Sequence, residues 1–180
     1  MLLTDIPTLD MLLHEHASAL GPDYDAYRNH TYRVVNACAA LSIQAAAQLE
    51  KLAIAVAFHD LGIWTDDTFD YLPPSMRRAR AHLARAGKSE WADEVDAMIL
   101  EHHKVRPYQT PDDRPWIVEP FRKADLVDLS LGLVTFGLPR SFLRDLNAAF
   151  PNAGFHKRLV QLATARLWSH PLKPLPMLRW

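Results

Sequence analysis

The segment from Lys51 to His59 constrains the fold more than any other part of the chain, because it is apolar nearly all round. It reads KLAIAVAFH and is followed at once by Asp60. A helix without a polar face has to be surrounded by other elements. We therefore expect 51–59 to be a buried central helix with a histidine and an aspartate at its end.

Helical periodicity and helix-ending residues recur along the rest of the 180 residues, whereas alternating strand patterns are hard to find. Gly62 is expected to end the central helix. The sequence predicts an all-α protein, a single-domain helical bundle spanning 1–180. Loops are expected over 64–74 and at the Pro-rich 106–116, and the Pro-rich tail 170–180 is expected to pack as an extended strap. The other expected helices are at about 9–20, 24–49, 75–86, 89–102, 121–133, 139–149 and 154–169.

The composition excludes several broad classes of protein. With a formal net charge of −1, the chain lacks the basic surplus of a nucleic-acid binder, so the expected partner is a small anionic molecule. Cys38 is the single cysteine, which leaves no intrachain disulfide and no cysteine zinc site, and we expect it to be a small buried apolar residue. Neither a secretory signal nor a membrane-spanning run is recognisable, which favours a cytoplasmic protein. Nothing in the sequence specifies the oligomeric state.

Polar residues stand at positions that the helical pattern would bury. His59 and Asp60 end the most apolar helix, His30 continues the apolar seam of its own helix, and Asp125 lies among apolar neighbours. A buried carboxylate must be paired, neutralised or bound to a metal. Each residue also has a simpler interpretation: a hydrogen-bonded core histidine for His30, an Asp60 that orients His59, and an Asp125–Arg122 pair. One metal ion would satisfy all four side chains together.

The ordered set His … His-Asp … Asp resembles the HD-domain superfamily of metal-dependent phosphohydrolases. The local contexts are NHTYRVVNACAAL, LAIAVAFHDLG and FRKADLVD, and AMILEHHK precedes the last Asp. The resemblance covers about 24–130 and leaves out the C-terminal helices and tail, 139–180. It implies that His30, His59, Asp60 and Asp125 are the metal ligands. It also implies hydrolysis of a small phosphate ester, a nucleotide being one candidate.

Two imidazoles and two carboxylates suit one divalent ion of Mn, Fe, Co, Ni or Zn, and suit Mg less well. Such an ion could activate water. Because two carboxylates neutralise a dication, other cations would have to hold an anionic substrate. Arg33, Lys104 and Arg122 are the candidates for substrate binding, although a plain salt bridge explains each of them equally well.

The general base is less clearly indicated. Some nucleotidases of the superfamily carry a catalytic Glu just beyond the His-Asp pair, where this chain has the apolar Ile63 and Trp64. The catalytic candidates are therefore His102, His103 and Asp128. Because neighbouring residues of a helix point in different directions, we expect one of the two adjacent histidines to face the site, with His103 preferred.

A second metal is a further alternative. Bimetallic relatives add histidines between the His-Asp pair and the last Asp, and the register places Ser75 where the first of these would stand. His82, together with His102 or His103, could supply them, but its neighbouring arginines favour a solvated basic face. The Gly-Tyr-Pro signature of the cyclic-dinucleotide branch is replaced here by VRPYQTPDD, which argues against that branch.

Two other functions stay open at this point. The first is a hydratase or diiron-type oxygenase acting on a non-phosphate molecule, which would be favoured if Trp64, Phe69, Tyr71 and Trp116 surround the metal. The second is a non-enzymatic binding module in which the metal is structural and partners dock on the tail ending in Trp180. A metal without an accessible open position would favour the binding module.

Overall fold

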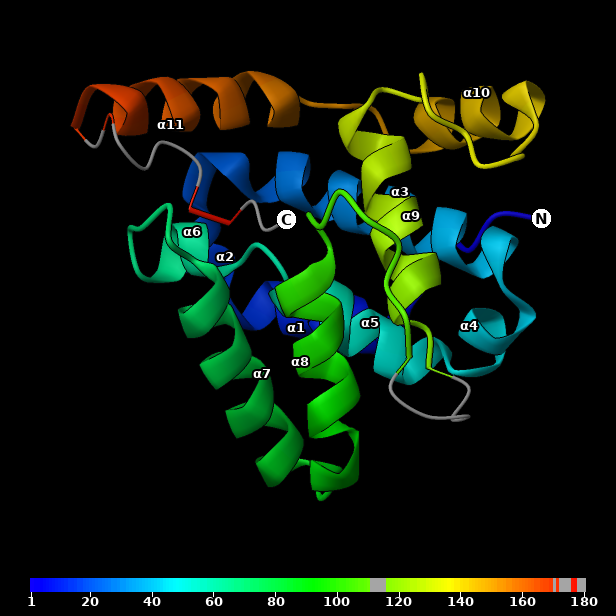
Figure 1. Cartoon of the computed structure of the whole chain (residues 1–180), viewed down its shortest axis with the longest axis horizontal. Coiled ribbons are helices and arrows are strands. Elements are labelled where there is room, and N and C mark those ends of the chain that lie inside the picture. Colours follow the sequence, from blue (N-terminus) through cyan, green and yellow to red (C-terminus); the bar gives the residue numbers. More distant parts are fainter. Residues whose placement is uncertain (111–115, 170, 172–175, 178–180) are drawn as a thin grey trace.

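A computed structural model describes residues 1–110, 116–169, 171, 176 and 177. This part of the chain contains helices, turns and loops and no strand, so the all-α prediction is confirmed for it (Figure 1). Most of the Pro-rich tail, including Trp180, and part of the expected loop 106–116 lie outside the described residues. The α-helices are α1 (Pro7–Glu15), α2 (Ala17–Leu20), α3 (Tyr24–Leu41), α4 (Ile43–Ala47), α5 (Leu49–Phe58), α6 (Gly62–Thr65), α7 (Leu72–Arg85), α8 (Ala92–Glu101), α9 (Val118–Leu129), α10 (Arg140–Ala149) and α11 (Phe155–Ser169).

Helix α5 is the buried centre of the bundle, as its composition predicts. Every residue from Leu52 to Phe58 is buried. Helices α1, α3, α7 and α8 pack around it. Because the segment 52–58 is buried on every side, the residues that follow it, His59 and Asp60, also lie in the interior.

Helices α3 and α9 cross at the centre of the molecule and pack closely against each other (Figure 1). The single helix expected over 24–49 is wrong, because the chain leaves the helical conformation at Ser42, with φ −149° and ψ 123°. The Ser42 hydroxyl oxygen accepts a hydrogen bond from the Ala45 backbone N–H at 3.3 Å, which caps the short α4. Local capping therefore outweighs the continuous apolar pattern.

Gly62 does not end the helical path, contrary to expectation, since it begins the short helix α6. A Cβ at this position would lie 2.6 Å from the carbonyl oxygen of Tyr71, so a close backbone approach requires the glycine. The Ser75 hydroxyl accepts a hydrogen bond from the Gly62 N–H at 3.0 Å. The expected loop 64–74 is correspondingly short, because α6 extends to Thr65 and α7 begins at Leu72.

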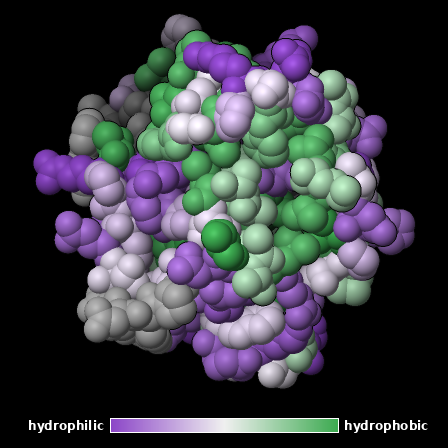
Figure 2. Space-filling view, turned by 90° about the vertical axis from the view of Figure 1, so that its right-hand side faces the viewer, coloured by the Kyte–Doolittle hydropathy of each residue, from purple (hydrophilic) through white to green (hydrophobic). Residues whose placement is uncertain are grey.

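Helices α10 and α11 lie along one side of the bundle, at the top of Figure 1. The segment between α9 and α10 exposes apolar side chains, among them Leu131 and Leu133. Figure 2, viewed from the right-hand side of Figure 1, shows hydrophobic residues reaching the surface between hydrophilic ones. Within the described residues, no helix combines the length and the apolar character needed to cross a membrane.

Candidate metal centre and adjoining pocket

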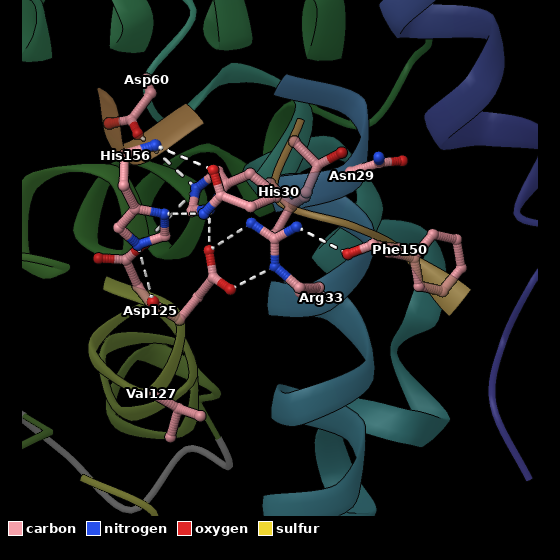
Figure 3. Close-up of polar contacts among 12 residues, drawn as sticks. Asn29, His30, Arg33, Asp60, Asp125, Val127, Phe150 and His156 are labelled. Atoms are coloured by element: carbon pink, nitrogen blue, oxygen red, sulfur yellow. Dashed lines mark hydrogen bonds and ion pairs between the residues drawn. The ribbon is translucent and has the colours of Figure 1, made fainter. Parts of the chain in front are cut away.

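The predicted ligands converge at the centre of the bundle. His30 comes from α3, His59 and Asp60 from the turn after α5, and Asp125 from α9. All four side chains are buried, with at most 3% of each residue exposed. The close packing of α3 against both α5 and α9 brings together residues that are far apart in the sequence (Figure 3).

The two histidines lie close enough to each other and to each carboxylate to share an ion, and His30, His59 and Asp125 form one candidate metal group among the described residues. His30 Nε2 lies 3.0 Å from His59 Nε2, 3.8 Å from Asp60 Oδ2 and 3.7 Å from Asp125 Oδ1. His59 Nε2 lies 3.4 Å from Asp60 Oδ2 and 3.7 Å from Asp125 Oδ1. Two atoms that each bind one ion at about 2.1 Å are separated by roughly 3.0–4.2 Å. The cluster is therefore a buried His/Asp group that could hold a metal ion.

The hydrogen bonds of the histidines fix which ring nitrogen faces the cluster. His59 Nδ1 donates to the Val56 carbonyl oxygen, and His30 Nδ1 donates to Asp128 Oδ2, both at 2.7 Å. In the neutral rings, both Nε2 atoms then carry lone pairs, which face each other across 3.0 Å. A proton or a metal ion between them would relieve this repulsion. A hydrogen bond at the opposite ring nitrogen is the usual arrangement for metal-binding histidines.

His102 and His103 both reach the cluster, so the expectation that only one of them faces it is wrong. Helix α8 ends at Glu101, and the two histidines occupy the turn that follows, where the helical spacing of side chains no longer applies. His102 Nε2 lies 3.4 Å from Asp60 Oδ1, and His103 Nδ1 lies 3.6 Å from Asp125 Oδ2. His102 Nδ1 donates to the Ile99 carbonyl oxygen at 2.7 Å, which directs the lone pair of Nε2 into the cluster.

Buried polar atoms on this side of the cluster are left without partners. Within the described part of the chain, Asp60 Oδ1, Asp125 Oδ2 and His102 Nε2 accept or donate no hydrogen bond. Such atoms are costly to bury unless a ligand satisfies them. Each carboxylate presents its other oxygen to His30 and His59. Among the described residues, the donor atoms form three overlapping groups: His30, His59 and Asp125; His59, Asp60 and His102; and His102, His103 and Asp125.

Asp128 lies behind His30, on the side away from the cluster. Its carboxylate accepts the His30 Nδ1–H and a second hydrogen bond from Arg33 Nη2 at 2.9 Å, and it pairs with Arg33 Nε as well. Arg33 Nη1 donates to the Phe150 carbonyl oxygen at 2.9 Å (Figure 3). Phe155, at the start of α11, stacks on the His30 ring with centroids 4.0 Å apart. This arrangement favours a positioning role for Asp128 over the role of general base.

The electrostatics of the cluster follow from burial and close charges. Burial would lower the pKa of His59, but the adjacent Asp60 and Asp125 carboxylates raise it to about 9. Burial and the neighbouring His102 lower the pKa of His103 to about 4. For Asp128, burial would raise the pKa, but the hydrogen bonds from His30 and Arg33 hold it far below its usual range. His103 is therefore a neutral imidazole at pH 7, whereas Asp128 is ionised.

The candidate substrate-binding cations are all engaged within the protein. Arg33 is 2% exposed and pairs with Asp128. Arg122 is 3% exposed, and two of its guanidinium nitrogens donate to the Glu119 carboxylate, at 2.7 Å each. Lys104 Nζ lies 2.8 Å from the carboxylate of Glu101. The salt-bridge interpretation therefore describes all three side chains in this structure.

His82 lies outside the cluster. Its half-buried ring packs against Phe58, with centroids 5.8 Å apart, and it belongs to none of the candidate metal groups among the described residues. His103, by contrast, lies within 3.6 Å of Asp125. Ser75, at the other position considered for an additional histidine, bonds to the turn after Asp60. Among the described residues, a second ion would therefore depend on His102 and not on His82.

A pocket of about 320 Å³ opens onto the cluster at Asp60 and His103. Two of the loop aromatics considered from the sequence, Phe69 and Tyr71, line it. The Tyr71 hydroxyl lies 2.7 Å from His103 Nε2. Trp64 packs elsewhere, on Tyr27, and its indole N–H donates to Asp23 at 2.9 Å. Trp116 is not among the described lining residues.

Several contributors to the site carry no signal in the sequence pattern. Tyr27 holds the turn after α5, since its hydroxyl donates to the Ala57 carbonyl at 3.1 Å and accepts from the Asp60 N–H at 3.4 Å. Phe155 and the α11 residues of the pocket lie beyond the segment that resembles the HD domains. Their roles depend on how α11 docks, which helical periodicity alone does not specify.

Comparison of the chain with protein-family models, with curated proteins and with solved structures finds no match. The class of site therefore rests on the geometry. The described part of the chain is all-helical and contains a buried His/Asp cluster that could hold a metal, and a pocket reaches this cluster from outside.

Proposed function

We propose that this protein is a metal-dependent phosphohydrolase of the HD-domain type, which cleaves a small phosphate ester with metal-activated water. The observation that carries the proposal is the set of buried, unpartnered donor atoms at Asp60, His102 and Asp125, beside the Nε2 atoms of His30 and His59, which lie 3.0 Å apart. A bound divalent ion would lower the pKa of its water and polarise a phosphoryl oxygen.

Charge balance favours two ions for a phosphate substrate. One dication with Asp60 and Asp125 is formally neutral, and Arg33, Arg122 and Lys104 are already paired. A second ion, held by the free oxygens of Asp60 and Asp125 together with His102 Nε2, would restore positive charge where the phosphate binds. The first ion would have His30 and His59 as its further ligands.

A side chain of the protein would accept the proton that the attacking water releases. His103 stands where the pocket meets the cluster, is neutral at pH 7, and is held by the Tyr71 hydroxyl. We assign to it the acceptance of a proton from the attacking water. The water oxygen bonds to phosphorus, the ester P–O bond breaks, and the departing alkoxide takes up the proton that His103 accepted.

A second candidate function is the hydration or oxygenation of an uncharged molecule, and the apolar walls of the pocket favour it. Hydration would suit a formally neutral centre with one ion, whereas a diiron-type oxygenation would need two. A purely structural metal is disfavoured, because the pocket gives access to Asp60 and thus to an open position.

The proposed function is tested with protein loaded with Mn²⁺, by elemental analysis and by release of phosphate from simple alkyl and aryl phosphates. Asp60→Ala should lose both the metal and the activity. Asp93→Ala, at a side chain that is 79% exposed, is the matched control and should retain both. Wild-type activity in a metal-free Asp60→Ala variant would rule out the proposal, and one ion per chain without phosphate release would favour the second candidate function.

A further inference from the structure

The pocket beside the cluster restricts which molecule can present its reacting group there. Asp60 and His103 form its floor. The part of a substrate that occupies the pocket would therefore lie next to the atoms that react at the cluster. One wall belongs to the segment after the His-Asp pair and the other to α11. The residues of these two walls are Ile63, Phe69, Tyr71, Leu159, Val160 and Ala163.

These walls present few groups that could hydrogen-bond to a polar ligand. Apart from Asp60 and His103, the described lining residues carry a single polar side-chain group, the Tyr71 hydroxyl, which is already engaged by His103 at 2.7 Å. A sugar or other polyol buried here would give up hydrogen bonds to water without replacing them, which is unfavourable. An alkyl or aromatic group would instead gain from leaving water.

The size and charge of the pocket further restrict which ligands can bind. A volume of about 320 Å³ is at the small end of ligand pockets, which span about 300–1,000 Å³. The described lining residues include no lysine or arginine, and Arg33, Arg122 and Lys104 are paired elsewhere. Among the described residues, nothing is placed to neutralise a second phosphate or a remote carboxylate.

The wall formed by α11 is firmly attached to the centre. Phe155 stacks on His30, and His156 Nε2 donates to the Asp128 carbonyl oxygen at 3.0 Å (Figure 3). Arg158 Nε lies 3.0 Å from the Asp23 carboxylate. These contacts hold the start of α11 beside the cluster, where the following residues of the helix form one wall of the pocket.

We infer that the substrate is a monophosphate of a short alkyl or single-ring aromatic alcohol, with the apolar group seated between the segment 63–71 and α11. The phosphate part of this inference rests on the proposed function, whereas the apolar part rests on the pocket. Nucleotides and sugar phosphates are expected to be poor substrates.

The first test compares methyl, n-butyl and n-hexyl phosphate with glycerol 1-phosphate, using the full chain loaded with Mn²⁺. We expect kcat/KM to rise about two- to fourfold per methylene along the alkyl series. Glycerol 1-phosphate should fall well below n-butyl phosphate. Equal rates along the series, or a preference for glycerol 1-phosphate, would overturn the inference and leave the proposed hydrolysis intact.

A matched pair of variants on α11 tests whether the dependence of kcat/KM on alkyl length arises in this pocket. Ala163→Phe should fill the pocket and reduce the hexyl-to-methyl ratio of kcat/KM at least tenfold. Ala165→Phe places the same side chain at an exposed position of the same helix that is not among the described lining residues, so the ratio should stay at the wild-type value. Equal ratios in both variants would show that the apolar group binds elsewhere.

A binding measurement tests the apolar pocket independently of whether the protein hydrolyses phosphate esters. n-Hexylphosphonate and methylphosphonate are titrated calorimetrically into the Mn²⁺-loaded protein and into the Ala163→Phe variant. Tighter binding of the hexyl compound, lost in the variant, would support the apolar pocket even if no ester were hydrolysed, in which case the proposed function alone fails. Equal binding of the two compounds, or binding of neither, would overturn the inference.

Discussion

His30 donates its Nδ1–H to Asp128 at 2.7 Å, and this contact directs the opposite ring nitrogen toward His59, 3.0 Å away. Asp128 is in turn held by Arg33, which reaches on to the Phe150 carbonyl oxygen. A chain of contacts thus runs from the end of α10 through α3 to the candidate metal centre. A residue that touches no reacting atom therefore sets the orientation of a predicted ligand.

Replacement of Asp128 should weaken metal binding without removing a ligand. Asp128→Asn keeps the shape of the side chain but loses the charge that orients His30 and pairs with Arg33, and we expect about a 10–100-fold loss of metal affinity. Competition with a chelator measures this. Asp145→Asn, at a side chain that is 64% exposed, is the control. An unchanged affinity in Asp128→Asn would mean that the contact does not orient the ligand.

Removal of His102 should change the number of bound ions. If Asp60 Oδ1, Asp125 Oδ2 and His102 Nε2 hold a second ion, His102→Ala should bind about one ion fewer per chain than the wild type, while the ion at His30 and His59 is retained. Elemental analysis gives the count, and His82→Ala should leave it unchanged, because His82 lies outside the cluster. Equal metal contents in all three proteins would contradict the second site.

Metal affinity should rise with pH. The adjacent carboxylates raise the pKa of His59 to about 9 against the effect of burial, so the ring is protonated at pH 7 and must lose its proton to bind an ion. Below that pKa, this one group should change the affinity by about tenfold per pH unit. Calorimetry in two buffers of different ionisation enthalpy should detect about one proton released. Release of none, or an affinity that falls as pH rises, would contradict this assignment, and His14→Gln is an exposed control.

Loss of His103 should impair turnover more than metal binding. His103→Gln removes the group that we assign as proton acceptor, and we expect kcat to fall at least tenfold, about 1.4 kcal/mol in the barrier. Tyr71→Phe removes the hydroxyl that holds His103 and should have a smaller effect in the same direction. Steady-state kinetics at full metal occupancy is the measurement. Turnover within about twofold of wild type in His103→Gln would assign the ring a structural role.

An added methyl group at Gly62 should destabilise the turn that carries the His-Asp pair. The new Cβ would lie 2.6 Å from the Tyr71 carbonyl oxygen, and such overpacking costs about 1–3 kcal/mol. Thermal unfolding of Gly62→Ala should therefore show a lower Tm, and metal occupancy should fall with it. A wild-type Tm would indicate that the backbone near Tyr71 shifts at no cost.

Much of the fold and the four central residues could be predicted from the sequence. In a chain of otherwise helical pattern, an apolar segment such as 51–59 indicates a buried helix. Polar residues at buried positions of 24–41 and 118–129 stand out against the helical pattern. The break at Ser42 and the helix begun by Gly62 were missed, because each depends on one local contact that overrides periodicity.

The sequence by itself therefore determined the all-helical class and the buried helix α5, since helical spacing specifies which residues share a buried face. It also singled out His30, His59, Asp60 and Asp125 as polar residues at buried positions, and a family resemblance predicted them as a ligand set. Only the tertiary structure decided that His102 and His103 both face the cluster, because they lie in a turn where that spacing no longer holds. It also decided that Arg33 pairs with Asp128, 95 residues away, and that α11 forms one wall of an apolar pocket beside Asp60. Such contacts join segments distant in the chain, and they depend on how helices dock and not on the periodicity within any one of them.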